Sequence, residues 1–282
     1  MGIDASVLNL MRHEHQVHGD FGDFVMLGRQ EIHVPAHELE AALGTDPSGY
    51  GRYCEELVMD HFGAPAVSSI DNSDFEGATH VFDLGASGPE LPGPFDTLLD
   101  AGTLEHVFHL PNALANVSAL VRPGGRIMHV LPANNQCGHG FWQFSPELFF
   151  SLYSPGRGYA DTEVYVVEVN RPARWWRVSP PTDGTRVTLS GFRPLYVMCR
   201  TTRTAEAVDH AGVQQSDYVH AWQVGRDHGA TSGMRERLKK TPAGPPLLDA
   251  LSAIRSVRSS IGSQVARWNP HLTPVAVSEL LR

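Results

Sequence analysis

The sequence predicts an α/β fold: a mostly parallel β-sheet with an antiparallel edge and with helices on both faces. Short apolar runs that have the length of strands alternate with segments whose apolar residues recur at helical spacing, which is typical of parallel sheets with helical crossovers. Several of the runs end at glycine or aspartate. In such sheets the carboxyl ends of the strands meet at one edge, and ligands bind there.

The first part of the chain contains three of the predicted strands. Residues 24–28 (FVMLG) form a short apolar run that ends in glycine, and 34–43 and 51–62 have helical spacing. Residues 66–71 (AVSSID) and 79–85 (THVFDLG) read as the next two strands, and both reach an aspartate. Two helices, rather than one, therefore separate the first strand from the second.

The middle of the chain continues the alternation. Residues 95–102 (FDTLLDAG) read as a strand, and 111–120 (PNALANVSAL) read as a helix with proline in its first turn. The RPGG sequence at 122–125 predicts a turn, because proline fixes φ at one corner and glycine tolerates positive φ at the next. Residues 126–132 (RIMHVLP) read as the following strand.

The last third of the chain has a weaker pattern. Residues 162–169 and 193–200 alternate enough to form an antiparallel pair that finishes the sheet, with a loop between them. Residues 238–246 read as a linker to a helix over 247–265. The apolar residues of this helix lie near one face, so we expect it to dock on its own domain or on a second subunit as a homodimer. They are Leu247, Leu251, Ile254, Ile261 and Val265.

Charge and composition exclude several classes of function. Lys and Arg number 22 against 31 Asp and Glu, which gives a net charge of −9. This balance disfavours nucleic acid and favours a cationic ligand. The three cysteines lie far apart in the sequence, which fits a reducing compartment. No secretory signal or membrane-length apolar run is apparent. We therefore expect a soluble cytoplasmic protein.

Residues 95–135 resemble a known family. The stretch FDTLLDAGTLEHVFHLPNALANVSALVRPGGRIMHVLPANN is similar to the second half of a class I S-adenosylmethionine-dependent methyltransferase domain. In that family a strand that begins Phe-Asp leads into a Leu-Glu-His-Val type turn, a helix, a Pro-Gly-Gly turn and another strand. The resemblance implies a Rossmann-like methyltransferase domain at 22–205, an N-terminal arm at 1–21 and a C-terminal extension at 206–282.

The resemblance also implies which residues contact S-adenosylmethionine. Asp71 would accept hydrogen bonds from the ribose hydroxyls and Asp83 from the adenine amino group, since carboxylates offer several acceptor sites. The alternative for both is a turn cap. Where the family usually has a GxGxG-like run, this chain has LGRQEI. The implied cofactor residues are Gly28, Asp71, Asp83, Leu84, Ala101, Gly102 and Thr103.

Two histidines are candidates for the catalytic base. Methyl transfer to a hydroxyl needs a base near neutral pH, and histidine is the commonest choice. His106 follows the strand end at the predicted cleft, and His139 lies between glycines. The alternative for both is a packed or solvated histidine. Glu105 reads as a residue near a helix N-terminus, with Thr103 as the N-cap.

Residues 138–150 (GHGFWQFSPELFF) resemble the segment that covers the acceptor in small-molecule members of the family. Phe141, Trp142 and Phe144 could form an apolar wall over the acceptor, or pack beneath the sheet. The three histidines in RHEHQVH (12–18) match no zinc signature. We therefore expect no metal site and read these histidines as part of a solvated or acceptor-facing arm.

Two functions remain open after this reading. The first is a small-molecule methyltransferase that uses S-adenosylmethionine, acting on oxygen of a sugar, nucleoside or specialised metabolite. The second is a protein of the same fold that binds the cofactor or a ligand without transferring methyl, and the LGRQEI sequence keeps this alternative open. A nicotinamide oxidoreductase is disfavoured because no G-x-G-x-x-G follows the first strand.

Overall fold

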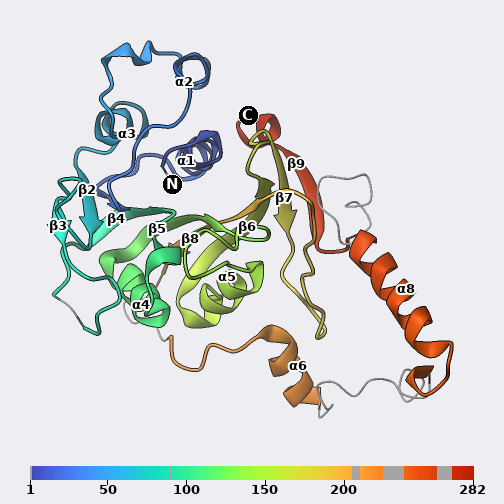
Figure 1. The fold of residues 1–282 in the computed structure, drawn as a ribbon. Helices are drawn as coiled ribbons and strands as arrows, with labels where there is room; N and C mark the ends of the chain where they lie inside the picture. Colours follow the sequence, from blue (N-terminus) through green and yellow to red (C-terminus); the bar gives the residue numbers. More distant parts are fainter. Residues whose placement is uncertain (1, 89, 205–209, 225–237, 259–268) are drawn as a thin grey trace.

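The computed structural model describes residues 2–88, 90–204, 210–224, 238–258 and 269–282 (Figure 1). Within these residues the strands form one nine-stranded sheet in the order β3-β2-β1-β4-β5-β8-β6-β7-β9. The predicted α/β fold is confirmed, because one part of this sheet is parallel, the other is antiparallel, and helices cover both faces (Figure 1).

The parallel part of the sheet contains the strands whose ends were predicted to form the site. β1 lies at its centre and pairs with β2 on one side and β4 on the other, and β3 and β5 follow outward. β3 is only two residues long, so the predicted strand at 79–85 is mostly loop. The strands are β1 Phe24–Leu27, β2 Val67–Asp71, β3 His80–Val81, β4 Phe95–Ala101 and β5 Val121–Pro132.

The antiparallel part contains two predicted strands and two that the sequence pattern did not predict. β8 (Leu195–Arg203) lies between β5 and β6 (Tyr159–Glu168), as expected for the finishing pair. β7 (Arg174–Val178) was expected to be loop, and β9 (Leu272–Ala276) comes from the C-terminal extension and pairs with β7. β7 is a strand because its consecutive tryptophans, Trp175 and Trp176, are buried in the cores on opposite faces of the sheet.

The helices form a layer on each face of the sheet. α4 (Leu110–Leu120) and α5 (Pro146–Leu152) bury their apolar residues in one core. α1 (Ala5–His18), α2 (Ala36–Leu43) and α3 (Glu55–Phe62) bury theirs in the other core (Figure 1). Alternate residues of each central strand enter the two cores, which follows from the two-residue period of a strand.

The N-terminal segment is a packed helix rather than a solvated arm. The Asp4 carboxylate caps α1 by accepting hydrogen bonds from the Ser6 and Val7 amides. One side of α1 is apolar and fully buried against the sheet. The three histidines that were weighed as metal ligands have separate partners: His13 lies beside Glu163, His15 beside Asp20 and His18 beside Arg200.

The described C-terminal helices are α6 (Ser216–Val224), α8 (Gly244–Arg258) and α9 (Val277–Leu280). The predicted apolar face of α8 is about half exposed at Leu247, Leu251 and Ile254, while Ile261 and Val265 lie outside the described residues. The homodimer stays a prediction. None of the helices in the described ranges combines the length and the apolar character that a membrane span requires.

Candidate functional site

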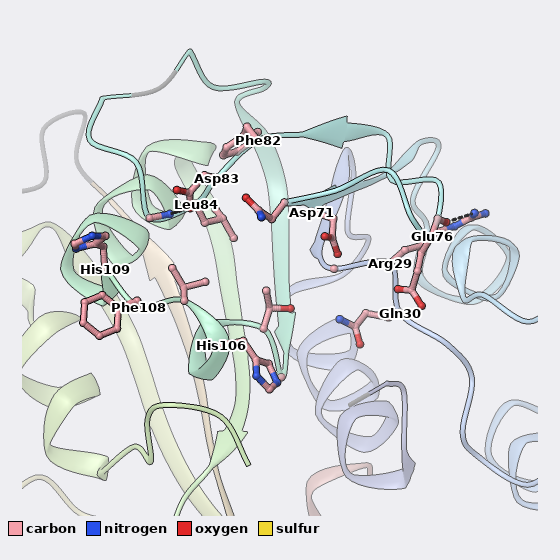
Figure 2. Close-up of a pocket in the computed structure, with 16 residues that line it drawn as sticks. Arg29, Gln30, Asp71, Glu76, Phe82, Asp83, Leu84, His106, Phe108 and His109 are labelled. Atoms are coloured by element: carbon pink, nitrogen blue, oxygen red, sulfur yellow. Dashed lines mark hydrogen bonds between the residues drawn. The ribbon is translucent and has the colours of Figure 1, made fainter. Parts of the chain in front are cut away.

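A cavity of about 460 Å³ lies at the carboxyl ends of β1, β2 and β4 (Figure 2). Its lining residues come from four loops, at residues 28–30, 71–76, 82–85 and 102–109. Seven of the residues predicted for the site line it: Gly28, Asp71, Asp83, Leu84, Gly102, Thr103 and His106. Ala101 is fully buried and is not among the lining residues. The lining residues that were not predicted are Arg29, Gln30, Asn72, Glu76, Phe82, Gly85, Val107, Phe108 and His109.

Gly28 makes the turn that opens the cavity after β1. Its φ of +67° lies in the left-handed region, which glycine adopts without steric cost. Its amide donates a hydrogen bond to the Ile70 carbonyl at 2.6 Å, which holds the end of β1 against β2. A Cβ at this position would lie 3.1 Å from the Thr103 hydroxyl and 3.3 Å from the Gln30 side-chain nitrogen. The turn therefore leaves very little room for any side chain.

Arg29 and Gln30 occupy the turn where the methyltransferase family usually has glycines. The Arg29 guanidinium lies 4.0 Å from the centre of the Tyr53 ring, and its Nε lies 2.6 Å from a Glu55 carboxylate oxygen. These contacts hold the arginine toward α3 and at the wall of the cavity. The Gln30 amide donates to the Leu27 carbonyl at 2.6 Å. Its side-chain oxygen is buried without a hydrogen-bond partner in the described structure.

Asp71 and Asp83 lie in two neighbouring loops at the same side of the cavity (Figure 2). Each makes the turn contact that was the alternative reading: Asp71 accepts from the Ser73 amide at 3.1 Å, and Asp83 accepts from the Gly85 amide at 2.7 Å. A carboxylate has about four acceptor positions, so one turn hydrogen bond leaves capacity for a ligand. Both roles are therefore compatible with these side chains.

Two asparagines of α4 hold the loop that carries Asp83. The Asn116 amide donates to the Leu84 carbonyl at 2.8 Å, and the Asn112 amide donates to the Gly85 carbonyl at 2.9 Å. The backbone of this loop is therefore fixed against the helix that follows β4. Neither asparagine was singled out in the sequence, because its partner lies about 30 residues away and no local pattern marks it.

The turn after β4 differs from the predicted helix start. The side chain of Thr103 makes no cap; its hydroxyl donates to the Leu27 carbonyl at 2.7 Å. Asp100 instead accepts from the Thr103 amide at 3.0 Å, while its other oxygen lies 2.8 Å from Nδ1 of the buried His129. The following turn, Leu104–His106, is a single 3₁₀ turn. Asp100 therefore takes the role that the sequence had suggested for Thr103.

Glu105 is buried beside the two candidate histidines, and the turn that contains it is a 3₁₀ turn instead of the predicted helix start. Its side chain is 0% exposed. His139 Nε2 lies 3.3 Å and His106 Nε2 lies 3.8 Å from its Oε1 atom. Burial, together with the negative charge of Asp100, raises the pKa of Glu105 to about 8. Burial and the neighbouring His139 lower the pKa of His106, so the neutral imidazole is favoured.

Only the first part of the predicted acceptor segment (residues 138–150) lies near the cavity. The His139 ring lies 5.4 Å from the His106 ring, and the exposed Phe141 ring lies 5.8 Å from Phe108 of the cavity wall. The Trp142 indole donates to the Val107 carbonyl at 2.9 Å. Phe144 is buried in the core beside α5, which was the alternative for these aromatics. Of the three, Phe141 and Trp142 therefore lie near the cavity.

Comparison with known proteins gives matches in structure alone. No protein-family model matches the sequence, and no curated protein matches it. The N-methyltransferase NodS from Bradyrhizobium japonicum WM9, solved with S-adenosyl-L-homocysteine, is 13% identical, with a TM-score of 0.36 over 71% of this chain and 86% of that chain. The 1,6-didemethyltoxoflavin-N1-methyltransferase from Burkholderia thailandensis is 18% identical, with a TM-score of 0.38 over 71% and 79%. The solved structures that this chain resembles thus include methyltransferases.

Proposed function

We propose that the protein is an S-adenosylmethionine-dependent methyltransferase that acts on oxygen of a small molecule, such as a sugar, a nucleoside or a specialised metabolite. One observation carries the proposal: Gly28, Asp71, Asp83 and Gly102 line a single cavity, although they lie at four separate strand ends. These are the positions that the resemblance of residues 95–135 and the strands before them assign to the cofactor. The size of the cavity, about 460 Å³, is within the range of small-molecule sites.

Methyl transfer from S-adenosylmethionine requires mainly that the protein position the methyl donor and the acceptor. S-adenosylmethionine, when bound, supplies a methyl group on a sulfonium that is already a good leaving group. Asp71 and Asp83 would orient the cofactor through its hydroxyl and amino groups, and Gln30 would offer an acceptor near its methionine end. Holding donor and acceptor in line lowers the barrier by removing the entropic cost of their encounter. His106, which lines the cavity, and His139, whose ring lies beside that of His106, would assist loss of the acceptor proton.

We also propose that the protein is cytoplasmic and that its partner is a small molecule. The three cysteines, Cys54, Cys137 and Cys199, are free, which fits a reducing, cytoplasmic compartment. The net charge of −9 argues for a small-molecule partner over nucleic acid.

Calorimetry on the full chain tests the cofactor. S-adenosylmethionine and S-adenosylhomocysteine should bind at one site, and NAD should not. Asp71→Ala should weaken binding by roughly 10- to 100-fold, since a hydrogen bond to a charged group contributes about 1.5–3 kcal/mol. Asp74→Ala, an exposed aspartate outside the lining of the cavity, is the matched control and should bind like the wild type. If the wild type binds neither adenosyl compound, the proposal is wrong.

A second function is favoured by Arg29 and Gln30, which stand where the family usually has glycine. A protein of this fold could bind the cofactor without transferring methyl. Transfer of a labelled methyl group to a panel of sugars, nucleosides and phenols separates the two functions. Tight cofactor binding without transfer to any acceptor, or to water-soluble extracts of small metabolites, would favour the second function.

A further inference from the structure

We propose that Glu105, His106 and His139 form a binding site for one divalent transition-metal ion of the zinc type at the edge of the cavity. Glu105 and His106 lie in the turn after β4, and His139 lies in the segment after β5. Metal-binding atoms of the three side chains all lie within 4.8 Å of one another. In the part of the chain that the structure describes, this is the one group of three such residues.

The distances fit a metal site before any ion is bound. Ligand atoms about 2.1 Å from a tetrahedral zinc ion lie roughly 3.4 Å apart. The distance from Glu105 Oε1 to His139 Nε2 is 3.3 Å, and that to His106 Nε2 is 3.8 Å. Both distances lie within about half an ångström of that separation. The ligand atoms of the two imidazoles lie within 4.8 Å of each other, so rotation of the side chains would bring the three atoms onto one ion.

The second observation is the unpartnered state of Glu105. Both of its carboxylate oxygens are buried without a hydrogen-bond partner among the described residues, and so is Nε2 of His139. A buried carboxylate is costly unless it is paired, hydrogen-bonded or bound to a metal. The charge that acts most strongly on Glu105 is that of the Asp100 carboxylate, which has the same sign. A cation held between Glu105 and the two imidazoles would supply the missing partner.

The backbone holds the two segments of the site together. The Glu105 carbonyl accepts hydrogen bonds from the Phe141 amide at 2.7 Å and from the Trp142 amide at 3.3 Å. Gly140, with φ of +80°, lies so close that a Cβ there would be 2.8 Å from Cγ of Glu105. The glycine therefore allows the close approach that brings His139 to the carboxylate.

The ligand types indicate which ion would bind. Two imidazoles and one carboxylate suit zinc and its neighbours, whereas magnesium and calcium prefer oxygen ligands. Three protein ligands would leave a fourth position open, as in catalytic zinc sites. His106 also lines the cavity, so the open position would lie at its edge.

The catalytic role of this ion rests on the proposed function, and in it His106 and His139 assist proton loss as ligands of the ion instead of as proton acceptors. An acceptor hydroxyl bound to the ion would lose its proton to solvent more readily. Its oxygen would then form the new bond to the methyl carbon as the carbon–sulfur bond breaks, leaving a neutral thioether. The binding of the ion itself does not depend on this role.

The test is titration of Co²⁺ into the untagged, metal-free, full-length protein, followed by visible absorption. We expect one Co²⁺ per chain, with the absorption of a low-symmetry site, displaced by Zn²⁺ and unaffected by excess Mg²⁺. Glu105→Gln and His139→Ala should each weaken Co²⁺ binding at least 100-fold. His109→Ala, which removes another histidine of the same cavity, should bind Co²⁺ within about twofold of the wild type.

Two further measurements, thermal melts of the variants and methyl transfer after chelation, distinguish loss of the metal site from misfolding and from loss of the catalytic role. Circular dichroism melts show that each variant is folded; Glu105→Gln has the same shape as the native residue and should fold. The site is overturned if the wild type binds no Co²⁺, or if Glu105→Gln and His139→Ala bind it as well as the wild type does. Methyl transfer that is unchanged after chelation would overturn the catalytic role while leaving the methyltransferase standing. Co²⁺ binding without binding of S-adenosylmethionine would support the metal site while the proposed function fails.

Discussion

The hydroxyl of Thr103 donates a hydrogen bond to the carbonyl oxygen of Leu27 at 2.7 Å, and so joins the turn after β4 to the end of β1. The same carbonyl accepts a hydrogen bond from the side-chain amide of Gln30 at 2.6 Å. Two segments of the cavity wall, the end of β1 with its following loop and the turn after β4, therefore meet at one backbone oxygen. Their relative positions depend on a contact between residues 76 positions apart in the sequence.

Removal of this hydroxyl should loosen the cavity without destroying the fold. In Thr103→Val the Leu27 carbonyl keeps its bond from Gln30, so we expect the free energy of unfolding to fall by about 1 kcal/mol. Binding of S-adenosylmethionine should weaken severalfold. Urea unfolding and calorimetry check the two effects, and Thr103→Ser should retain wild-type values. Equal cofactor affinity in all three proteins would contradict the role given to this hydrogen bond.

Gly28→Ala should impair the cavity more than a comparable change elsewhere. The new methyl group would meet the Thr103 hydroxyl at 3.1 Å and would force a side chain into φ of +67°. Gly44→Ala is the matched control, because it has φ of +72° but no atom within 4 Å of the new methyl group. Both should lose about 1 kcal/mol of stability through the backbone. Only Gly28→Ala should also lose affinity for S-adenosylmethionine, measured by calorimetry.

His106 and His139 should act as one unit in methyl transfer. Each single change to alanine should lower the rate of transfer by roughly 10²–10⁴, the range for loss of assisted proton removal. The double variant should be little slower than either single one, since groups that act together give non-additive effects. His37→Ala, which removes an exposed histidine outside the lining of the cavity, should stay within a few fold of the wild type. Single-turnover transfer of a labelled methyl group measures the rate of each variant. If the loss of rate in the double variant equals the product of the two single losses, the two histidines act separately.

Glu163 should make the stability of the protein depend on acid pH. Burial alone would raise the pKa of Glu163, but hydrogen bonds from His13 and Tyr165 and the charges of Arg200 and Arg177 outweigh it and lower the pKa to about 2. A lowered pKa stabilises the fold above the ordinary value of 4.5, and this stabilisation is lost as the pH falls toward 2. Because Glu163 is partly exposed and solvent screens its charge, this stabilisation is about 1–2 kcal/mol at neutral pH.

Replacement of Glu163 by glutamine tests this dependence. Glu163→Gln should be less stable than the wild type at pH 7, and the two proteins should converge as the pH falls from about 4.5 to 2, in urea unfolding at each pH. The exposed Glu279→Gln is the control and should change stability by less than about 0.5 kcal/mol. A constant difference between wild type and Glu163→Gln at all pH values would contradict the assignment.

The sequence by itself determined four strands of the parallel part of the sheet, β1, β2, β4 and β5, and the residues at their ends, whereas most of the predicted strand at 79–85 is loop. Those features depend on local information: the two-residue alternation of a buried strand, the helical spacing between strands, and glycine or aspartate where a strand must stop. Gly28, Asp71, Asp83 and Gly102 were predicted to share one edge because parallel strands place their carboxyl ends together, and all four line the cavity.

The tertiary structure decided the features that depend on distant partners. β7 has no clear alternation, and Trp175 and Trp176 form a strand only because each face of the sheet offers a core to one of them. Glu105 looked like a residue near a helix start, because its sequence neighbours are those of a capped turn. Its burial beside His139 is imposed by hydrogen bonds from the Phe141 and Trp142 amides, which no local pattern encodes. The strand-end residues that line the cavity could therefore be predicted from the sequence, whereas the proposed metal site depends on the packing of two loops.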